Sequence, residues 1–159
     1  MEVIVADNAG FCFGVKRAIK MASDTLDEAE GPVKSLGQLI HNPQVVNRFH
    51  GRGLEVVSDL TELAPDGTVV IRSHGVGPEV RLEAEARSLR VVDTTCPFVT
   101  KAQQYAAKLI AENYKVVMIG DAHHPEVIGV VAHTQGKAIV IDTVEEAEKL
   151  KFIPRMGVV

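Results

Sequence analysis

The chain has 159 residues, 46% of them hydrophobic and 24% charged, a composition that indicates a globular protein and excludes a disordered or fibrous one. Its formal net charge is −4 and its longest basic run is Lys16-Arg17, which argues against a nucleic-acid partner. Its apolar runs are far shorter than the roughly 20 residues of a membrane helix, and two cysteines 84 positions apart do not make a secreted disulfide framework. We therefore expect a reduced, cytoplasmic protein without a membrane partner, whose apolar start is a first strand and not a signal peptide.

Short β-branched runs alternate with helix-like patterns along the chain. We expect strands at residues 3–6, 33–35, 54–57, 68–72, 90–93, 115–119 and 138–141. We expect helices at residues 15–30, 43–51, 78–89, 97–112, 125–132 and 144–150. Four of these helices begin with proline, whose fixed φ and missing N–H suit the first helical position. The alternation predicts an α/β fold of small, mostly parallel sheets flanked by helices.

The sequence also repeats itself at an offset of 83 to 84 residues. Three segments of the first half have counterparts in the same order in the second half: 12–18 with 96–102, 36–41 with 119–124, and 54–59 with 138–143. This repetition predicts two homologous lobes, residues 1–94 and 95–159. We expect the second lobe to be incomplete, because its last apolar run matches an interior strand of the first.

Residues able to bind metals or anions lie in the turns that leave the predicted strands. Cys12 follows the first strand, His41 the second, His74 the fourth, Cys96 the fifth and His124 the sixth. In open parallel sheets, ligands bind outside the carboxyl ends of the strands, where helix N-termini favour phosphate. This placement predicts one shared site.

Each of these residues also has an ordinary explanation when it is taken alone. A free cysteine is often a core residue, and a single turn histidine is usually a surface residue. However, Gly10 and Gly14 give the segment around Cys12 the backbone freedom that a tight ligand loop needs, and Cys96 lies at a helix start, which favours the thiolate that metals bind. The three histidines together fit a diphosphate, to which protonated imidazoles would donate charge-assisted hydrogen bonds.

Three further polar residues lie beside these turns. Glu126, in the first turn of the helix after His124, either compensates the helix dipole or relays a proton. Thr94 and Thr95 precede Cys96, and we expect them to cap the following helix, with bonds to cluster sulfurs as the alternative.

Five motifs, in chain order, resemble those of the 4-hydroxy-3-methylbut-2-enyl diphosphate reductase family. The motifs lie at residues 10–18, 40–46, 73–76, 93–99 and 124–127, and the resemblance extends from about residue 5 to 141. It implies three similar α/β lobes around a central cavity and a [4Fe–4S] cluster held by one cysteine per lobe, with one iron open.

The resemblance assigns roles to six residues of this chain. Cys12 and Cys96 match cluster ligands, and Glu126 matches the glutamate that delivers protons. The histidines that match diphosphate-binding residues are His41, His74 and His124. The implied reaction is the reductive dehydroxylation of (E)-4-hydroxy-3-methylbut-2-enyl diphosphate to isopentenyl and dimethylallyl diphosphate, with ferredoxin or flavodoxin as electron donor.

The third cysteine of the family has no counterpart in these 159 residues. We therefore expect the N-terminal portion of a longer enzyme, inactive by itself, in which the first strand packs on a third lobe. One alternative is a non-catalytic α/β module that binds a phosphate ligand and has structural cysteines. A second is a structural zinc site of Cys12, Cys96 and histidines, which is disfavoured because the cysteines lack short spacing.

Overall fold

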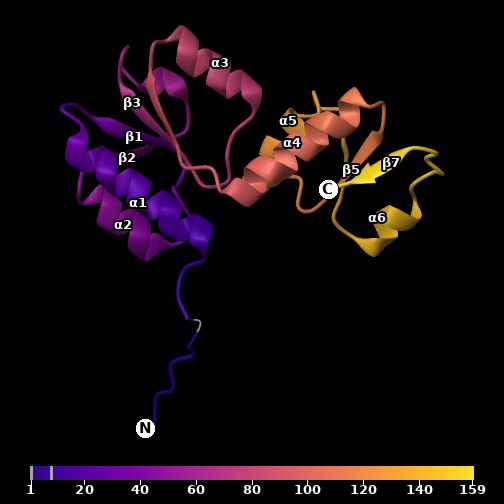
Figure 1. Cartoon of the computed structure of the whole chain (residues 1–159), viewed down its shortest axis with the longest axis horizontal. Coiled ribbons are helices and arrows are strands. Elements are labelled where there is room, and N and C mark those ends of the chain that lie inside the picture. The colour runs from indigo at the N-terminus through magenta and orange to yellow at the C-terminus, as the bar shows by residue number, and fades with distance from the viewer. Residues whose placement is uncertain (1, 8) are drawn as a thin grey trace.

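The computed structural model describes residues 2–7 and 9–159, and these residues form two α/β lobes joined by the segment before the long helix α4 (Figure 1). The first lobe contains the helices α1 (Phe13–Glu28), α2 (Pro43–His50), η1 (Leu60–Glu62) and α3 (Pro78–Ala86). Its strands are β1 (Val33–Leu36), β2 (Leu54–Val57), β3 (Thr68–Ile71) and β4 (Arg90–Asp93). The second lobe contains α4 (Pro97–Ala111), β5 (Lys115–Ile119), α5 (Pro125–Ala132), β6 (Ile139–Ile141), α6 (Val144–Glu148) and β7 (Met156–Val158).

The two sheets share the order of three strands. The strand order is β2-β1-β3-β4 in the first lobe and β6-β5-β7 in the second, and every strand pair among the described residues is parallel. Val33 of β1, for example, pairs with Leu54 and Thr68 on its two sides. The predicted α/β fold of small parallel sheets flanked by helices is confirmed, and the matching strand orders bear out the internal repeat. The lobe boundary between residues 94 and 95 stays a prediction.

Successive side chains of β3 point to opposite faces of the first sheet, and each face has its own core. Val70 packs with Ala18 of α1 and Phe49 of α2, and all three are at most 2% exposed. Val69 and Ile71 pack on the other face, which α3 covers. This two-sided burial explains why β3 reads as a continuous apolar run.

Local sequence signals placed most elements correctly. The four helices expected to begin with proline do so, at residues 43, 78, 97 and 125. Thr143 caps α6 by accepting a hydrogen bond from the backbone N–H of Glu146. No helix in residues 2–7 and 9–159 is both long enough and apolar enough to cross a bilayer.

The strand predicted at residues 3–6 is wrong. Residues 2–6 form no strand, and Val3, Ile4 and Val5 are 72–83% exposed. Figure 1 shows this arm extending away from both lobes. A strand requires a neighbour that pairs with its N–H and C=O groups, and none lies beside the described part of this arm.

Candidate functional site

Three turns that leave strands carry the predicted histidines. His41 lies between β1 and α2, where Asn42 caps the helix by accepting from the Val45 N–H at 3.0 Å. His74 lies between β3 and α3 and is followed by Gly75, whose φ of +72° favours glycine. His124 is the N-cap residue of α5. The parallel arrangement of the strands brings these turns to the same end of the sheets.

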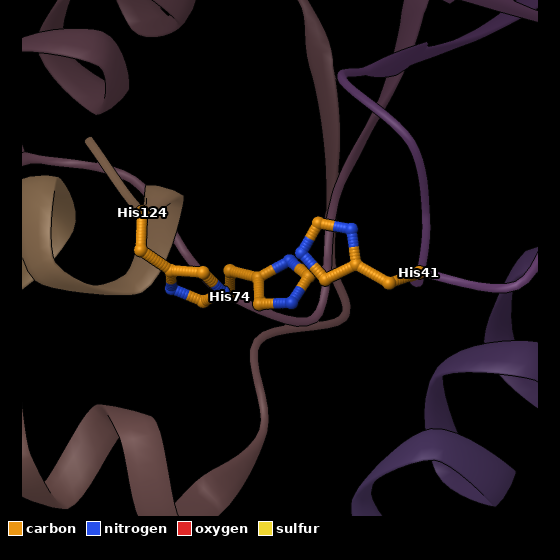
Figure 2. A group of neighbouring side chains, drawn as sticks. All are labelled: His41, His74 and His124. Carbon is orange, nitrogen blue, oxygen red and sulfur yellow. The ribbon is translucent and has the colours of Figure 1, made fainter. Parts of the chain in front are cut away.

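The three imidazole rings lie against one another (Figure 2). The ring centroids of His41 and His74 are 4.4 Å apart. The ring centroid of His124 lies 5.5 Å from that of His41 and 5.4 Å from that of His74. One nitrogen of each ring lies within 4.8 Å of the others. Two of these residues come from the first lobe and one from the second, so the group spans the junction between the lobes.

Backbone hydrogen bonds fix the turn that carries His74. The N–H of Ser73 donates to the carbonyl of Leu39 at 3.1 Å, which joins this turn to the one that carries His41. The carbonyl of Ser73 accepts from the N–H of Cys96 at 2.8 Å. Ser73 is only 7% exposed, so water competes little for these bonds. The histidine turns and the Cys96 turn therefore form one hydrogen-bonded unit.

His74 is neutral in the free protein at pH 7. Burial, together with smaller electrostatic contributions from His41, His124 and Arg72, lowers the pKa of His74 to about 4. Its Nδ1 is buried and has no hydrogen-bond partner among the described residues. The ring is therefore neutral before an anion arrives. The sequence suggested protonated imidazoles around a bound diphosphate, but it does not reveal the burial or the neighbouring rings.

The position of His124 at the start of α5 selects one tautomer of its neutral ring. Its Nδ1 accepts a hydrogen bond from the backbone N–H of Glu126 at 3.2 Å. The proton of the neutral ring is then on Nε2, which can donate to an anion without a positive charge. Glu126 is half-buried in the first helical turn, two residues from this imidazole.

The two cysteines lie at the N-termini of equivalent helices. Cys12 is the N-cap residue of α1 and Cys96 that of α4, and both are free thiols, the first exposed and the second half-buried. A Cβ built on Gly14 would fall 2.5 Å from the Sγ of Cys96, so this sulfur rests on the first turn of α1. Arg17 of α1 also donates to the carbonyl of Thr95 at 3.1 Å. The starts of α1 and α4 therefore meet.

The threonines before Cys96 do not act as expected. Thr94 donates its hydroxyl to the carbonyl of Ile71 at 2.6 Å, and Thr95 donates its hydroxyl to the carboxylate of Asp93. The N-cap residue of α4 is Cys96, so the cap prediction is wrong. The sequence missed Asp93, although an Asp two residues before a Thr in a turn is a recognised turn signal.

A cavity on the first lobe lies apart from the three-histidine group. Its volume is about 550 Å³, and its lining includes Lys34, His50 and Glu55 on the outer side of the first lobe. Lys34 of β1 and Glu55 of the edge strand β2 already form an ion pair of 3.1 Å there. The other three histidines, His50, His123 and His133, do not belong to the three-histidine group.

Fold and site together define a parallel α/β protein whose strand-end turns gather three imidazoles, in a unit hydrogen-bonded to the turn of the free thiol Cys96. The family model described as "LytB protein" matches residues 3–159. The chain therefore belongs to the LytB protein family.

Relatives with known names support this placement. The 4-hydroxy-3-methylbut-2-enyl diphosphate reductases of Geobacter metallireducens and Clostridioides difficile are 49% and 41% identical over 100% and 96% of this chain. The matched regions are 56% and 54% of those proteins, so the chain spans little more than half the length of these curated relatives.

Two solved structures have the same fold. The (E)-4-hydroxy-3-methyl-but-2-enyl diphosphate reductase described as the terminal enzyme of the non-mevalonate pathway matches 98% of this chain and 56% of its own, at 43% identity and a TM-score of 0.84. The Plasmodium falciparum E-1-hydroxy-2-methyl-but-2-enyl-4-diphosphate reductase matches 96% of this chain and 48% of its own, at 28% identity and a TM-score of 0.90.

Proposed function

We propose that this chain supplies part of the active site of a cytoplasmic iron–sulfur reductase of isoprenoid biosynthesis. The proposed reaction converts (E)-4-hydroxy-3-methylbut-2-enyl diphosphate to isopentenyl and dimethylallyl diphosphate, with ferredoxin or flavodoxin as electron donor. The observation that carries this proposal is the convergence of His41, His74 and His124 to within 4.8 Å of one another, in turns bonded to that of Cys96. The reductase names of the relatives support the same reaction.

The residues present fit two of the three cysteine positions expected around a [4Fe–4S] cluster. Cys12 and Cys96 are free thiols at helix N-termini, where the positive end of the dipole stabilises the thiolate. The contact of Cys96 Sγ with Gly14 places this thiol two residues from Cys12. When bound, such a cluster supplies electrons and a Lewis-acidic iron toward the hydroxyl group of the substrate.

The three histidines would bind the diphosphate group. His124 can donate from Nε2 while its ring is neutral, because the Glu126 N–H occupies Nδ1. His74 takes up a proton when the diphosphate binds, since the negative charge raises a pKa that is about 4 in the free protein. Charge-assisted hydrogen bonds of this kind contribute about 1.5–3 kcal/mol each when they are shielded from water.

Glu126 is the proposed proton donor. Its place in the first turn of α5, directly after the diphosphate-binding His124 and Pro125, puts a carboxyl group at the edge of the same site. A carboxyl oxygen of Glu126 would hold the proton and release it to the substrate. Its backbone N–H meanwhile donates to Nδ1 of His124, so Glu126 would both orient this imidazole and supply the proton.

The alternatives are weaker on specific grounds. A zinc site of cysteines and histidines requires their ligand atoms to lie together, but among the described residues the compact group contains the three histidines alone. A metal bound to Nε2 of His124 would also displace the proton that the Glu126 contact places there. A phosphate-binding module without catalysis remains the second candidate, because the three imidazoles suit an anion in either case.

A chimera tests the proposed reaction. Residues 1–159 would replace the matching part of the Geobacter metallireducens reductase, with which they share 49% identity. Anaerobic assays with (E)-4-hydroxy-3-methylbut-2-enyl diphosphate and reduced ferredoxin should give both product diphosphates. In the Glu126→Gln chimera, substrate affinity should stay within about threefold while turnover falls by about 10²-fold or more, because the shape remains and the proton source is lost.

The two candidate functions give different results in this chimera. Loss of turnover in the unsubstituted chimera, together with retained binding of inorganic pyrophosphate, would leave only the binding module. A Glu126→Gln chimera with normal turnover would refute the proposed role of Glu126. The unmodified Geobacter metallireducens reductase, assayed alongside, controls for the electron donor.

A further inference from the structure

A carboxylate at the end of β4 fixes the turn that leads to Cys96. Asp93 accepts a hydrogen bond on Oδ1 from the Thr95 backbone N–H at 2.9 Å, and it also accepts a short one from the Thr95 hydroxyl. Its other oxygen, Oδ2, forms an ion pair with Arg81 of α3. A carboxylate bonded to the backbone two residues later closes an Asx turn, which sets the direction of the chain.

Thr95 and Cys96 touch the residues on both sides of His74. A Cβ built on Gly75 would fall 2.9 Å from Cγ2 of Thr95 and 3.2 Å from its Oγ1, so Thr95 packs directly beneath that glycine. On the other side, the N–H of Cys96 donates to the carbonyl of Ser73 at 2.8 Å. The turn that Asp93 closes therefore supports the His74 turn at two points.

The carboxylate keeps its charge at neutral pH. Burial raises the pKa of Asp93, but the hydrogen bonds from Thr95 and the ion pair with Arg81 outweigh burial and hold the pKa below its ordinary value. Its side chain is 32% exposed and that of Arg81 is 38% exposed. A partly exposed ion pair stabilises little by itself, so the bonds to Thr95 are the specific part of the arrangement.

We propose that Asp93 is a positioning residue that holds the thiol of Cys96 and the imidazole of His74 in one relative placement. Asp93 acts through Thr95, which links the turn of the cysteine to the turn of the histidine. This role rests on the function proposed above, since it sets a cluster ligand against a diphosphate ligand. Neither Asp93 nor Arg81 is among the site residues predicted from the sequence.

The test uses the 159-residue chain and two measurements. The first is the hydrogen-exchange rate of the Cys96 amide, relative to the core amide of Val70, and the second is the dissociation constant for inorganic pyrophosphate. In Asp93→Ala, which removes both acceptor oxygens, each should increase about tenfold, the factor that corresponds to ~1.4 kcal/mol. Asp93→Asn keeps an oxygen that accepts from the Thr95 N–H and should restore most of both values.

Arg81→Gln is the matched control. It removes the ion pair and leaves the bonds between Asp93 and Thr95, so both measurements should stay within about twofold of the native chain. If Asp93→Ala does not fold, as judged by rapid exchange at Val70, Thr95→Val takes its place. That variant lacks the hydroxyl bond, and it should change both values in the same direction by a smaller factor.

Three results would overturn the proposal. The first is an unchanged Cys96 amide and dissociation constant in Asp93→Ala, or in Thr95→Val in its place, which would show that the turn does not need the hydrogen bonds that the variant removes. Arg81→Gln with an effect as large as that of Asp93→Ala would reduce Asp93 to an ion-pair partner. Failure of Asp93→Asn to restore either value would likewise reduce Asp93 to an ion-pair partner of Arg81. If the native chain does not bind pyrophosphate, the proposed function fails, while exchange at Cys96 still decides the role of Asp93.

Discussion

At the scale of single residues, the charge of His74 depends on what surrounds it. The sequence predicted protonated imidazoles that donate to a bound diphosphate, and it did not show the charge of the ring without one. Burial, with smaller electrostatic contributions from His41, His124 and Arg72, lowers the pKa of His74 to about 4, against an ordinary value of 6.5. The ring is thus neutral until an anion offsets these charges. Burial and the proximity of the rings, which the sequence does not state, decide the charge.

This shift has a defined effect on stability. The folded chain binds fewer protons at His74 than the unfolded chain between about pH 4 and 6.5. The stabilisation is therefore fully present above pH 6.5 and is lost as the pH falls through this window. We expect His74→Asn to lose less stability than the native chain over the same window, as measured by urea unfolding.

Pyrophosphate should reverse the shift. NMR titration of the His74 ring should give a midpoint near pH 4 in the free chain and a clearly higher one with saturating pyrophosphate. Binding then takes up a proton, so affinity should rise as the pH falls from 8 to about 6. The affinity of His74→Asn should depend less on pH. The titration of pyrophosphate itself affects both proteins equally, so it cancels when the two are compared. A free ring that titrates at its ordinary value would contradict this account.

At the scale of elements, the contact between α1 and α4 brings the cysteines together. Local signals correctly predicted both helices and placed Cys96 at a helix start, whereas the helix after Cys12 begins two residues earlier than expected. They did not show that Gly14 allows the Cys96 sulfur to rest on the first turn of α1. The sequence suggests that Gly14 provides backbone freedom, whereas in the structure Gly14 allows close packing.

Gly14→Ala tests this contact. Alanine in place of glycine normally favours a helix by up to about 1 kcal/mol. Here the new Cβ would lie 2.5 Å from Sγ of Cys96, so we expect a loss of about 1–3 kcal/mol in unfolding free energy. The matched control is Gly51→Ala, whose Cβ would meet its nearest atoms at 3.6 Å and should be tolerated.

A double-mutant cycle separates the clash from other effects. In a Cys96→Ala background, Gly14→Ala should cost much less, because the sulfur that it meets is gone. Equal costs in both backgrounds would mean that the Cys96 sulfur does not rest on α1. Faster alkylation of Cys96 in Gly14→Ala would show directly that the thiol has been displaced.

At the scale of the whole molecule, two lobes that share the order of three strands place their first helices head to head. The sheet orders β2-β1-β3 and β6-β5-β7 match, and so do the positions of Cys12 and Cys96 before α1 and α4. The imidazoles from both lobes then meet at the junction (Figure 2). Repetition of one unit therefore generates a site that neither unit contains alone.

The metal content of the chimera tests this arrangement. Anaerobically purified chimera should be brown, with about four iron atoms per chain. Cys96→Ser should abolish the visible absorption, because a cluster ligand is lost, whereas His123→Asn, at an exposed histidine outside the site, should leave it unchanged. A colourless chimera that contains zinc would favour the structural zinc site. An unchanged spectrum in Cys96→Ser would mean that Cys96 is not a cluster ligand.

The sequence by itself determined the class of fold, the order of nearly all elements and the six residues proposed for the site. These features depend on signals between near neighbours, such as proline at helix starts, β-branched runs and turn residues after strands. The internal repeat added the equivalence of the two lobes, because it compares residues in register and needs no structure.

Only the tertiary structure decided which groups touch. It removed the strand at residues 3–6, lowered the pKa of His74, set the tautomer of His124 and assigned Asp93 to the Cys96 turn. Two of these four outcomes, the first strand and the charge of His74, depend on atoms far away in the sequence. A strand forms only beside a partner and a charge depends on its surroundings, so neither is fixed by local propensity.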